Sequence, residues 1–251
     1  MNDHVFAMRE VVHIPGQSPT LVFLHEGLGC VAMWKDFPAQ LANATGCSAL
    51  IYSRAGYGQS DPVELPRPLD YMEKQGVAEL AQTLAGIEDA VLIGHSDGGS
   101  IALAYAANHT GLRGVIVEAA HVFCEQISVR SIEAARVDYE QGELRRRLQR
   151  YHGSNVDCAF WGWNQAWLHP DFQKWNIERF LSAIRVPVLV IQGRQDEYGT
   201  LAQVDAIARQ VASSQVLILE ECGHTPHRDQ PEQTLRATHA FISQLRCQPR
   251  Q

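Results

Sequence analysis

The sequence has few basic residues. Its 251 residues include 21 Lys and Arg against 28 Asp and Glu, which gives a formal net charge of −7 at pH 7. Nucleic acids and anionic membrane surfaces are bound by concentrated basic faces, so we expect neither as a partner. The one dense basic run, Arg145 to Arg147, lies in a polar stretch that indicates a solvent-exposed helix face.

Metal-ligand spacing and long apolar runs are also missing. The six cysteines follow no CxxC or similar pattern, which argues against both a disulfide framework and a zinc site. No apolar run is long enough to span a bilayer, and the first residues, MNDHVFAMRE, carry acids and lack the apolar segment of a secretory signal. We therefore expect a cytoplasmic protein with no bound metal.

Short apolar runs recur along the chain, in which 45% of the residues are hydrophobic. Six runs rich in Val, Ile and Leu are typical of strands buried on both faces; they span 21–24, 49–52, 90–93, 114–117, 187–191 and 215–219. Most are separated by helix-length segments with apolar residues three and four apart, at 71–85, 99–108, 200–211 and 231–245. This alternation predicts an α/β fold, a mostly parallel central sheet with helices on both faces.

One long stretch interrupts the alternation. No strand is predicted between residues 121 and 183, and this stretch holds Trp161, Trp163, Trp167 and Trp175. We predict that 121–183 is a helical cap inserted over the catalytic edge of a core formed by 1–120 and 184–251. Trp161 and Trp163 are predicted to contact substrate, the alternative being a place in the cap's own core.

The strongest motif is GHSDGG at 94–99, which directly follows a predicted strand and opens a helical segment. A strand, a sharp turn and a helix are the context that a nucleophile elbow requires. Gly94 and Gly98 allow the sharp turn and a close approach of helix and strand. Ser96 is therefore predicted to lie on strained backbone with its hydroxyl exposed above the sheet, as the nucleophile.

A serine hydroxyl needs a base to take its proton at neutral pH, and histidine can supply one. His224 lies in ECGHTPH, directly after the last predicted strand, at the edge of the sheet where ligands bind in folds of this kind. We predict that His224 is the base. His227 is the alternative, and a structural or pocket-lining role is our prediction for it.

The imidazole must be held in one tautomer, and its transient positive charge must be offset by a carboxylate. Asp196 follows the strand predicted at 187–191 through a short turn, and Ser, Asp, His is one of the known chain orders for such a triad. Glu197 is adjacent, and Glu118 ends the preceding predicted strand. Asp196 is our choice, with these two as alternatives.

Attack on a carbonyl also needs N–H donors for the oxyanion that forms. The backbone N–H of Asp97, the residue after the nucleophile, is the first predicted donor. The second is expected in the loop HEGLG after the first predicted strand, where glycines let the backbone approach the substrate. We choose Gly27, with its neighbours Glu26 and Leu28 as alternatives, and we predict that both neighbours contact substrate.

These motifs resemble the α/β-hydrolase superfamily, in its serine-nucleophile, esterase-like branch with a helical cap. The segments that carry the resemblance are LVFLHEGLG, YSRAGYGQSD, VLIGHSDGGSIAL, VPVLVIQGRQDEYGT and ECGHTPH, and they cover almost the whole chain. The resemblance implies an enzyme that needs no cofactor. Relatives with an aspartate at the centre of the elbow act as dehalogenases or epoxide hydrolases, and Ser96 argues against both activities.

Two loops depart from the family pattern. Glu26 stands where many relatives have glycine, and Ser53 stands where an aspartate is common. We hypothesise that Glu26 pairs with Arg54 beside the loop HEGLG at 25–29, which is called the oxyanion loop because the second donor is expected there. The segment before residue 21 is short, so the first, antiparallel strand of the family's sheet is expected to be reduced or missing.

The leading functional prediction is a carboxylesterase-type enzyme. It would hydrolyse a small carboxylic ester, lactone or thioester through an acyl-enzyme on Ser96. A carbon-carbon bond hydrolase of a diketone-like substrate would use the same three residues and is the second candidate. The third is a ligand receptor of the same fold with an idle triad. In each case the expected partner is a small molecule.

Overall fold

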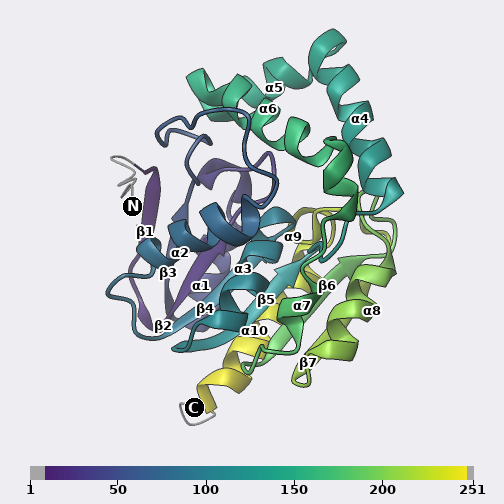
Figure 1. Cartoon of the computed structure of the whole chain (residues 1–251). Coiled ribbons are helices and arrows are strands. Elements are labelled where there is room, and N and C mark those ends of the chain that lie inside the picture. The colour runs from purple at the N-terminus through teal and green to yellow at the C-terminus, as the bar shows by residue number, and fades with distance from the viewer. Residues whose placement is uncertain (1–8, 248–251) are drawn as a thin grey trace.

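The computed structural model describes residues 9–247, which form a central sheet with helices packed on both of its faces (Figure 1). Within that range the sheet has seven strands in the order β1-β3-β2-β4-β5-β6-β7. In chain order the strands are β1 (Val11–Ile14), β2 (Gln17–Leu24), β3 (Cys47–Tyr52), β4 (Ala90–His95), β5 (Leu112–Glu118), β6 (Val188–Gly193) and β7 (Ser214–Leu219). The six apolar runs of the sequence form β2 to β7, so the fold prediction is confirmed.

Helices connect the parallel strands. They are α1 (Phe37–Thr45), α2 (Val77–Thr83), α3 (Asp97–Asn108), α4 (Gln126–Gln141), α5 (Leu144–His152), α6 (Val156–Trp167), α7 (Glu178–Leu181), α8 (Leu201–Gln210), α9 (Pro226–Asp229) and α10 (Pro231–Cys247). Single helical turns form η1 (Val31–Trp34), η2 (Met72–Gly76), η3 (Gly153–Asn155) and η4 (Pro170–Lys174). The predicted helices at 99–108, 200–211 and 231–245 correspond to α3, α8 and α10, and η2 followed by α2 forms the one predicted at 71–85.

Two apolar cores flank the sheet, because successive side chains of a strand point to opposite faces. In β2, Val22 and Leu24 face the core built with α2, α3 and α8, whereas Leu21 and Phe23 face the core built with α1 and α10. All four side chains have no exposed surface. Burial on both faces explains why the strand sequences are continuous apolar runs.

The first strand is short but present. β1 pairs antiparallel with β3, with Val11 opposite Tyr52 and Ile14 opposite Ala49. β2 pairs in parallel with both β3 and β4. The first strand is therefore present with four residues, and the expectation that it could be missing was wrong.

The long stretch without predicted strands folds as helices. α4, α5 and α6 lie together at the top of Figure 1, beyond the sheet, whereas α7 lies beside α3 and α8 and contacts both. The arginine run lies on α5, where Arg145, Arg146 and Arg147 each pair with a carboxylate at the surface. The predicted solvent-exposed face is thus confirmed.

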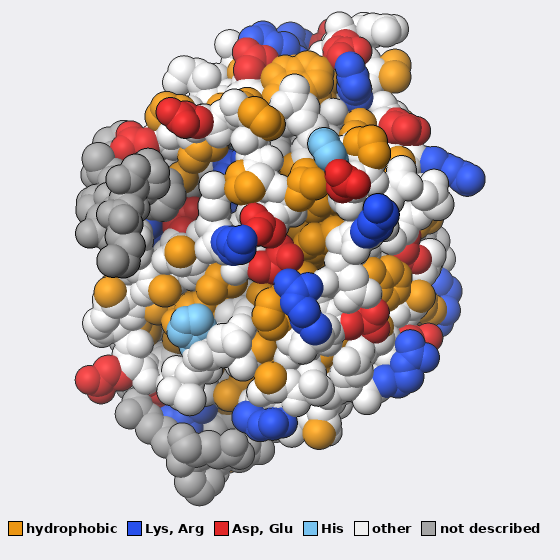
Figure 2. Space-filling view, in the orientation of Figure 1, with side chains coloured by type: hydrophobic (Ala, Val, Ile, Leu, Met, Phe, Trp, Pro, Cys, Tyr) orange, Lys and Arg blue, Asp and Glu red, His pale blue; other side chains and the backbone are white. Residues whose placement is uncertain are grey.

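The surface carries mixed charges. Figure 2 shows Lys and Arg side chains interspersed with Asp and Glu across one face of the molecule. No helix among residues 9–247 has both the length and the apolar character needed to cross a membrane.

Candidate active site

Ser96 lies at the turn between β4 and α3, and its backbone has φ 52° and ψ −118°. This left-handed φ is strained for a residue with a side chain. The turn is tight, because a Cβ atom at Gly94 would collide with the backbone of Gly98, and one at Gly98 would collide with the carbonyl of Leu24. These two glycines let α3 pack directly on the sheet, and the Ser96 hydroxyl is left at the carboxyl edge.

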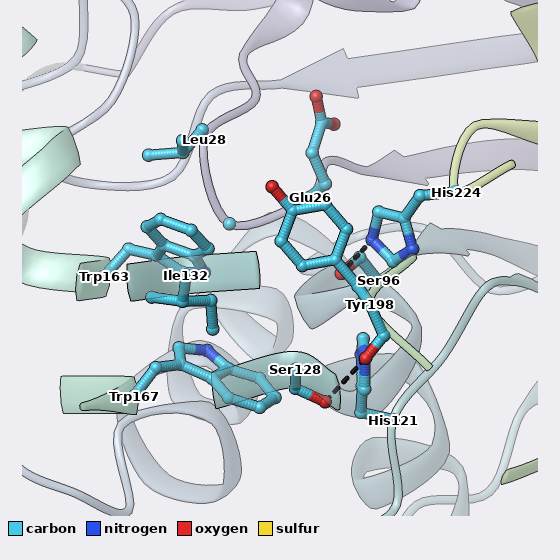
Figure 3. A pocket seen from close by; sticks show the side chains of 11 residues that line it. Glu26, Leu28, Ser96, His121, Ser128, Ile132, Trp163, Trp167, Tyr198 and His224 are labelled. Carbon is cyan, nitrogen blue, oxygen red and sulfur yellow. Dashed lines mark hydrogen bonds between the residues drawn. The ribbon is translucent and has the colours of Figure 1, made fainter. Parts of the chain in front are cut away.

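The structure brings Ser96, His224 and Asp196 into contact. The Ser96 Oγ lies 3.0 Å from His224 Nε2, a hydrogen bond drawn as a dashed line in Figure 3. His224 Nδ1 lies 2.8 Å from Asp196 Oδ1 and 2.9 Å from Oδ2. Because a carboxylate only accepts hydrogen bonds, Nδ1 carries the proton and Nε2 is free to accept the serine proton. Three side chains from loops after β4, β6 and β7 therefore form one hydrogen-bonded chain.

Asp196 is held from several sides. Its Oδ1 accepts the N–H of Tyr198 at 2.7 Å, and its Oδ2 accepts the side-chain amide of Gln192 at 2.7 Å. Burial alone would raise the pKa of Asp196, but the hydrogen bond and charge of His224, together with the Tyr198 N–H, bring it below the ordinary value. The carboxylate is therefore ionised at neutral pH and faces the imidazole.

The two alternative acids lie elsewhere. Glu118 is fully buried and its Oε2 accepts both the backbone N–H of His227, at 3.1 Å, and the His227 Nδ1, at 2.8 Å. Glu197 is exposed to solvent. His227 itself stacks on Phe37 and lies against Trp34. Of the two roles predicted for His227, the structure therefore favours the structural one, and the ring does not line the cavity beside Ser96.

Glu118→Ala is expected to lower the free energy of unfolding by about 3 kcal/mol, because it leaves two buried His227 donors without an acceptor. The value of kcat should stay close to that of the wild type, since Glu118 makes no contact with His224. Urea unfolding and steady-state kinetics would measure both effects. Glu118→Gln keeps an acceptor oxygen and should lose less stability. A large fall in kcat in Glu118→Ala, with its stability intact, would instead show that Glu118 takes part in catalysis.

The loop after β2 is fixed by buried polar contacts. His25 Nδ1 bonds the carbonyl of Glu26 at 2.7 Å, and its Nε2 accepts the backbone N–H of Arg54 at 3.0 Å. The Arg54 guanidinium donates to the carbonyls of His25 and Glu26. The hypothesis of a side-chain pair between Glu26 and Arg54 is thus wrong: Arg54 contacts the backbone of this loop, and the Glu26 carboxylate contacts His95 instead, with Oε2 3.4 Å from Nδ1.

Of the two predicted oxyanion donors, Gly27 lines the cavity that holds Ser96, and Asp97 directly follows Ser96 at the start of α3. The N–H of Gly27 donates to no acceptor among residues 9–247. Asp97 is the first residue of α3, so its N–H has no carbonyl one turn earlier in the helix to bond with. Gly27 must be glycine here, because a Cβ atom would overlap the indole of Trp163. Neither the N–H of Gly27 nor that of Asp97 thus has a hydrogen-bond acceptor in the described part of the chain.

A cavity of about 100 Å³ opens beside Ser96 and His224. Glu26, Leu28 and Trp163 line it as predicted, whereas Trp161 does not. Trp161 packs on Tyr139 and Phe160, and Arg136 lies over its ring. This indole belongs to the packing between α4 and α6, so the structure does not place Trp161 at the cavity where substrate contact was predicted.

Further lining residues were not predicted from the sequence. They are His121, Ser128, Ile132, Trp167 and Tyr198 (Figure 3). The Tyr198 carbonyl accepts hydrogen bonds from Ser128 Oγ at 2.5 Å and from His121 Nε2 at 3.1 Å. Burial lowers the pKa of His121, and the nearby His224 lowers it further, so His121 is neutral and its Nε2 carries the proton. Its place just past β5, at the carboxyl edge, is a signal that could have identified it.

The side chain of Asp97 connects the elbow to α6. It is buried and accepts hydrogen bonds from the Tyr71 hydroxyl and from Trp167 Nε1. Trp167 therefore has a fixed position in the pocket wall. No group of three or more side chains suited to holding a metal ion occurs among residues 9–247.

A mostly parallel sheet with this strand order, helices on both faces and a polar site at its carboxyl edge defines the α/β-hydrolase class of fold. A model of the alpha/beta hydrolase family matches residues 21–237, and the chain belongs to that family. It is similar to a proline iminopeptidase of Saccharolobus solfataricus, with 25% identity over 279 residues that cover 94% of this chain and 88% of the relative.

Solved structures show the same fold. A thermophilic esterase from Thermogutta terrifontis superposes with a TM-score of 0.74 at 19% identity, covering 94% of this chain and 93% of that one. An enol-lactonase from Burkholderia xenovorans LB400 superposes with a TM-score of 0.71 at 20% identity, covering 94% and 96%. The named activities differ among these relatives, so the substrate must be argued from the pocket.

Proposed function

We propose that the protein is a carboxylesterase-type serine hydrolase that cleaves a small ester, or a related lactone or thioester. The observation that carries the proposal is the contact of Ser96 Oγ with His224 Nε2, at 3.0 Å, inside a cavity whose walls are mainly apolar. A hydroxyl bonded to a neutral imidazole, which is itself bonded to a carboxylate, is the arrangement that activates a serine.

In the proposed reaction the Ser96 oxygen attacks the ester carbonyl while its proton moves to His224 Nε2. The N–H groups of Gly27 and Asp97 would hold the oxyanion, and Asp196 would offset the charge of the imidazolium. The proton then passes to the alcohol, which leaves. Water attacks the acyl-enzyme by the same route and releases the acid and free Ser96.

The wall of the pocket favours an ester over a peptide with a free amino terminus. A cationic amine needs a carboxylate partner, and Glu26 is the one acidic residue that lines the cavity in the described part of the chain. Its carboxylate contacts His95 and points away from Trp167 (Figure 3). Leu28, Ile132 and the two indoles would instead bind an apolar acyl group, and a cavity of about 100 Å³ suits a compact one.

We further propose that residues 121–183 act as the cap of this site. α4 contributes Ser128 and Ile132 to the cavity wall, and α6 contributes Trp163 and Trp167. Trp163 lies on Gly27. A cap in this position would exclude water from the oxyanion donors and strengthen their hydrogen bonds to the developing charge.

A fluorophosphonate probe tests the proposal. It should add to Ser96, as peptide mapping by mass spectrometry would show, and the labelled protein should lose activity on p-nitrophenyl acetate. A panel of short esters, lactones, thioesters and ring-cleavage diketones then separates the substrate classes. Turnover of diketones alone would favour a carbon-carbon bond hydrolase, and the absence of any adduct on Ser96 would favour a receptor.

A further inference from the structure

A second pair of side chains lies behind the predicted triad and takes no part in the proposed proton transfer. His95 precedes Ser96 in the turn after β4 and is almost completely buried, with 1% of its side chain exposed. Its Nδ1 lies 3.4 Å from Glu26 Oε2, and its Nε2 lies 2.7 Å from the carbonyl oxygen of His224. One imidazole therefore connects the oxyanion loop, the nucleophile turn and the loop that carries His224.

The two contacts define the protons on the His95 ring. A carbonyl oxygen only accepts hydrogen bonds, so Nε2 carries a proton. A carboxylate also only accepts, so the approach of Nδ1 to Glu26 favours a second proton there. Burial lowers the pKa of His95, but the contact with Glu26 and the charge of Glu118 outweigh it and raise the pKa to about 9. At neutral pH, His95 and Glu26 are thus an imidazolium and a carboxylate.

Other groups pack around this imidazole. The rings of His224 and His227 lie 5.2 and 5.3 Å from it, and Trp34 of η1 lies 6.3 Å away. The acids that act on it are Glu26, after β2, and Glu118, at the end of β5. Glu118 is already bonded to His227, which leaves Glu26 as the carboxylate in direct contact with His95.

The position of Glu26 raises an electrostatic problem. Its backbone adjoins Gly27, where we place one oxyanion donor, and it lines the same cavity as Ser96. An unpaired carboxylate there would repel the oxyanion that forms during attack, and a like charge in a site of low dielectric is strongly unfavourable. A cation in contact with the carboxylate removes this repulsion.

We propose that Glu26 and His95 are positioning residues that form an ion pair, which holds the oxyanion loop against the His224 loop and neutralises the carboxylate beside the oxyanion. The inference rests on the proposed function. It accounts for a glutamate at this place in the sequence, because the imidazole that compensates its charge is the residue directly before the nucleophile.

The pair has a defined pH dependence. Its imidazolium is present at neutral pH and loses its proton as the pH rises through about 9. Above that pH the Glu26 carboxylate is uncompensated, so kcat/KM should fall on the alkaline side. In Glu26→Gln the partner charge is gone, burial again lowers the pKa of His95, and the alkaline fall near pH 9 should disappear.

The experiment has two arms on the full chain. In the first, 15N shifts of labelled histidine rings are followed from pH 5 to 10.5: His95 should carry two ring protons at pH 7.5 in the wild type and one in Glu26→Gln. In the second, kcat/KM for p-nitrophenyl acetate is measured over the same range. Glu197→Gln removes an exposed carboxylate near the same edge and should leave both results as in the wild type.

A neutral His95 in the wild type at pH 7.5 would overturn the proposal, as would an alkaline fall that persists unchanged in Glu26→Gln. If Glu26 and His95 served packing alone, Glu26→Gln would change neither the protonation of His95 nor the pH dependence of kcat/KM. The first arm needs no turnover, so it separates the two hypotheses: a charged His95 in a protein whose Ser96 takes no probe would leave the ion pair intact and refute the proposed hydrolase activity.

Discussion

Ser96→Ala is expected to lower kcat for esters by about 10⁶-fold, the loss typical of removing the nucleophile from a triad. The alanine has no atom that can form the acyl-enzyme, and the imidazole of His224 then has no proton to accept from the chain. Because the remaining turnover would be close to the uncatalysed rate, it should be measured over hours at a high enzyme concentration.

The fold should survive this change. The Ser96 hydroxyl bonds only His224 within residues 9–247, whereas the backbone N–H and carbonyl of Ser96 bond Glu118 and Ser100 and are unaffected. Alanine meets the same backbone strain at φ 52° that serine does. Thermal unfolding of the two proteins should therefore nearly coincide. Activity within about tenfold of the wild type in a well-folded variant would refute Ser96 as the nucleophile.

The sheet could be predicted from the sequence because its strands are buried on both faces. A strand such as 90–93 must be apolar at every position when helices cover both sides, and a pattern of that kind is visible in one dimension. The turn at Ser96 was predictable for a similar reason, since Gly94 and Gly98 occur where any Cβ would meet the backbone of a neighbouring element.

The pocket wall was only partly predictable, although helical spacing held a usable signal. In α6, Trp163 and Trp167 are four residues apart and share one face, whereas Trp161 lies two residues from Trp163 on another face. The structure places the first two in the cavity and the third outside it. A composition argument alone could not separate them, since all three tryptophans lie in the same short segment.

The partner of Glu26 was not predictable, because two buried bases lie close to it. Arg54 was the more obvious partner because its guanidinium is always charged, but that group donates to the backbone carbonyls of His25 and Glu26. His95 was assigned no role in the sequence motif. Which of the two a glutamate side chain contacts depends on its rotamer in the folded loop, and no spacing rule determines that.

Asp196→Asn is expected to lower kcat by about 10⁴-fold at neutral pH, if the site behaves as well-studied triads do. The amide oxygen should occupy the Oδ1 position, where the N–H groups of Tyr198 and Gly199 donate at 2.7 and 3.3 Å. The amide nitrogen then takes the Oδ2 position, 2.9 Å from His224 Nδ1. A donor there favours the tautomer with its proton on Nε2, which cannot accept the proton of Ser96.

In this orientation the amide nitrogen of the asparagine faces the amide nitrogen of Gln192, which in the wild type donates at 2.7 Å to Asp196 Oδ2. Turning the Gln192 amide so that its oxygen accepts from the asparagine would break its other hydrogen bond, at 3.2 Å to the carbonyl of Gly199. The loss should appear in kcat with little change in KM, because Asp196 lies outside the cavity wall. Glu197→Gln provides the matched control, since its carboxylate is adjacent and exposed. Undiminished kcat in Asp196→Asn, with a loss in Glu197→Gln, would move the acid to Glu197 and would require the loop after β6 to rearrange before catalysis.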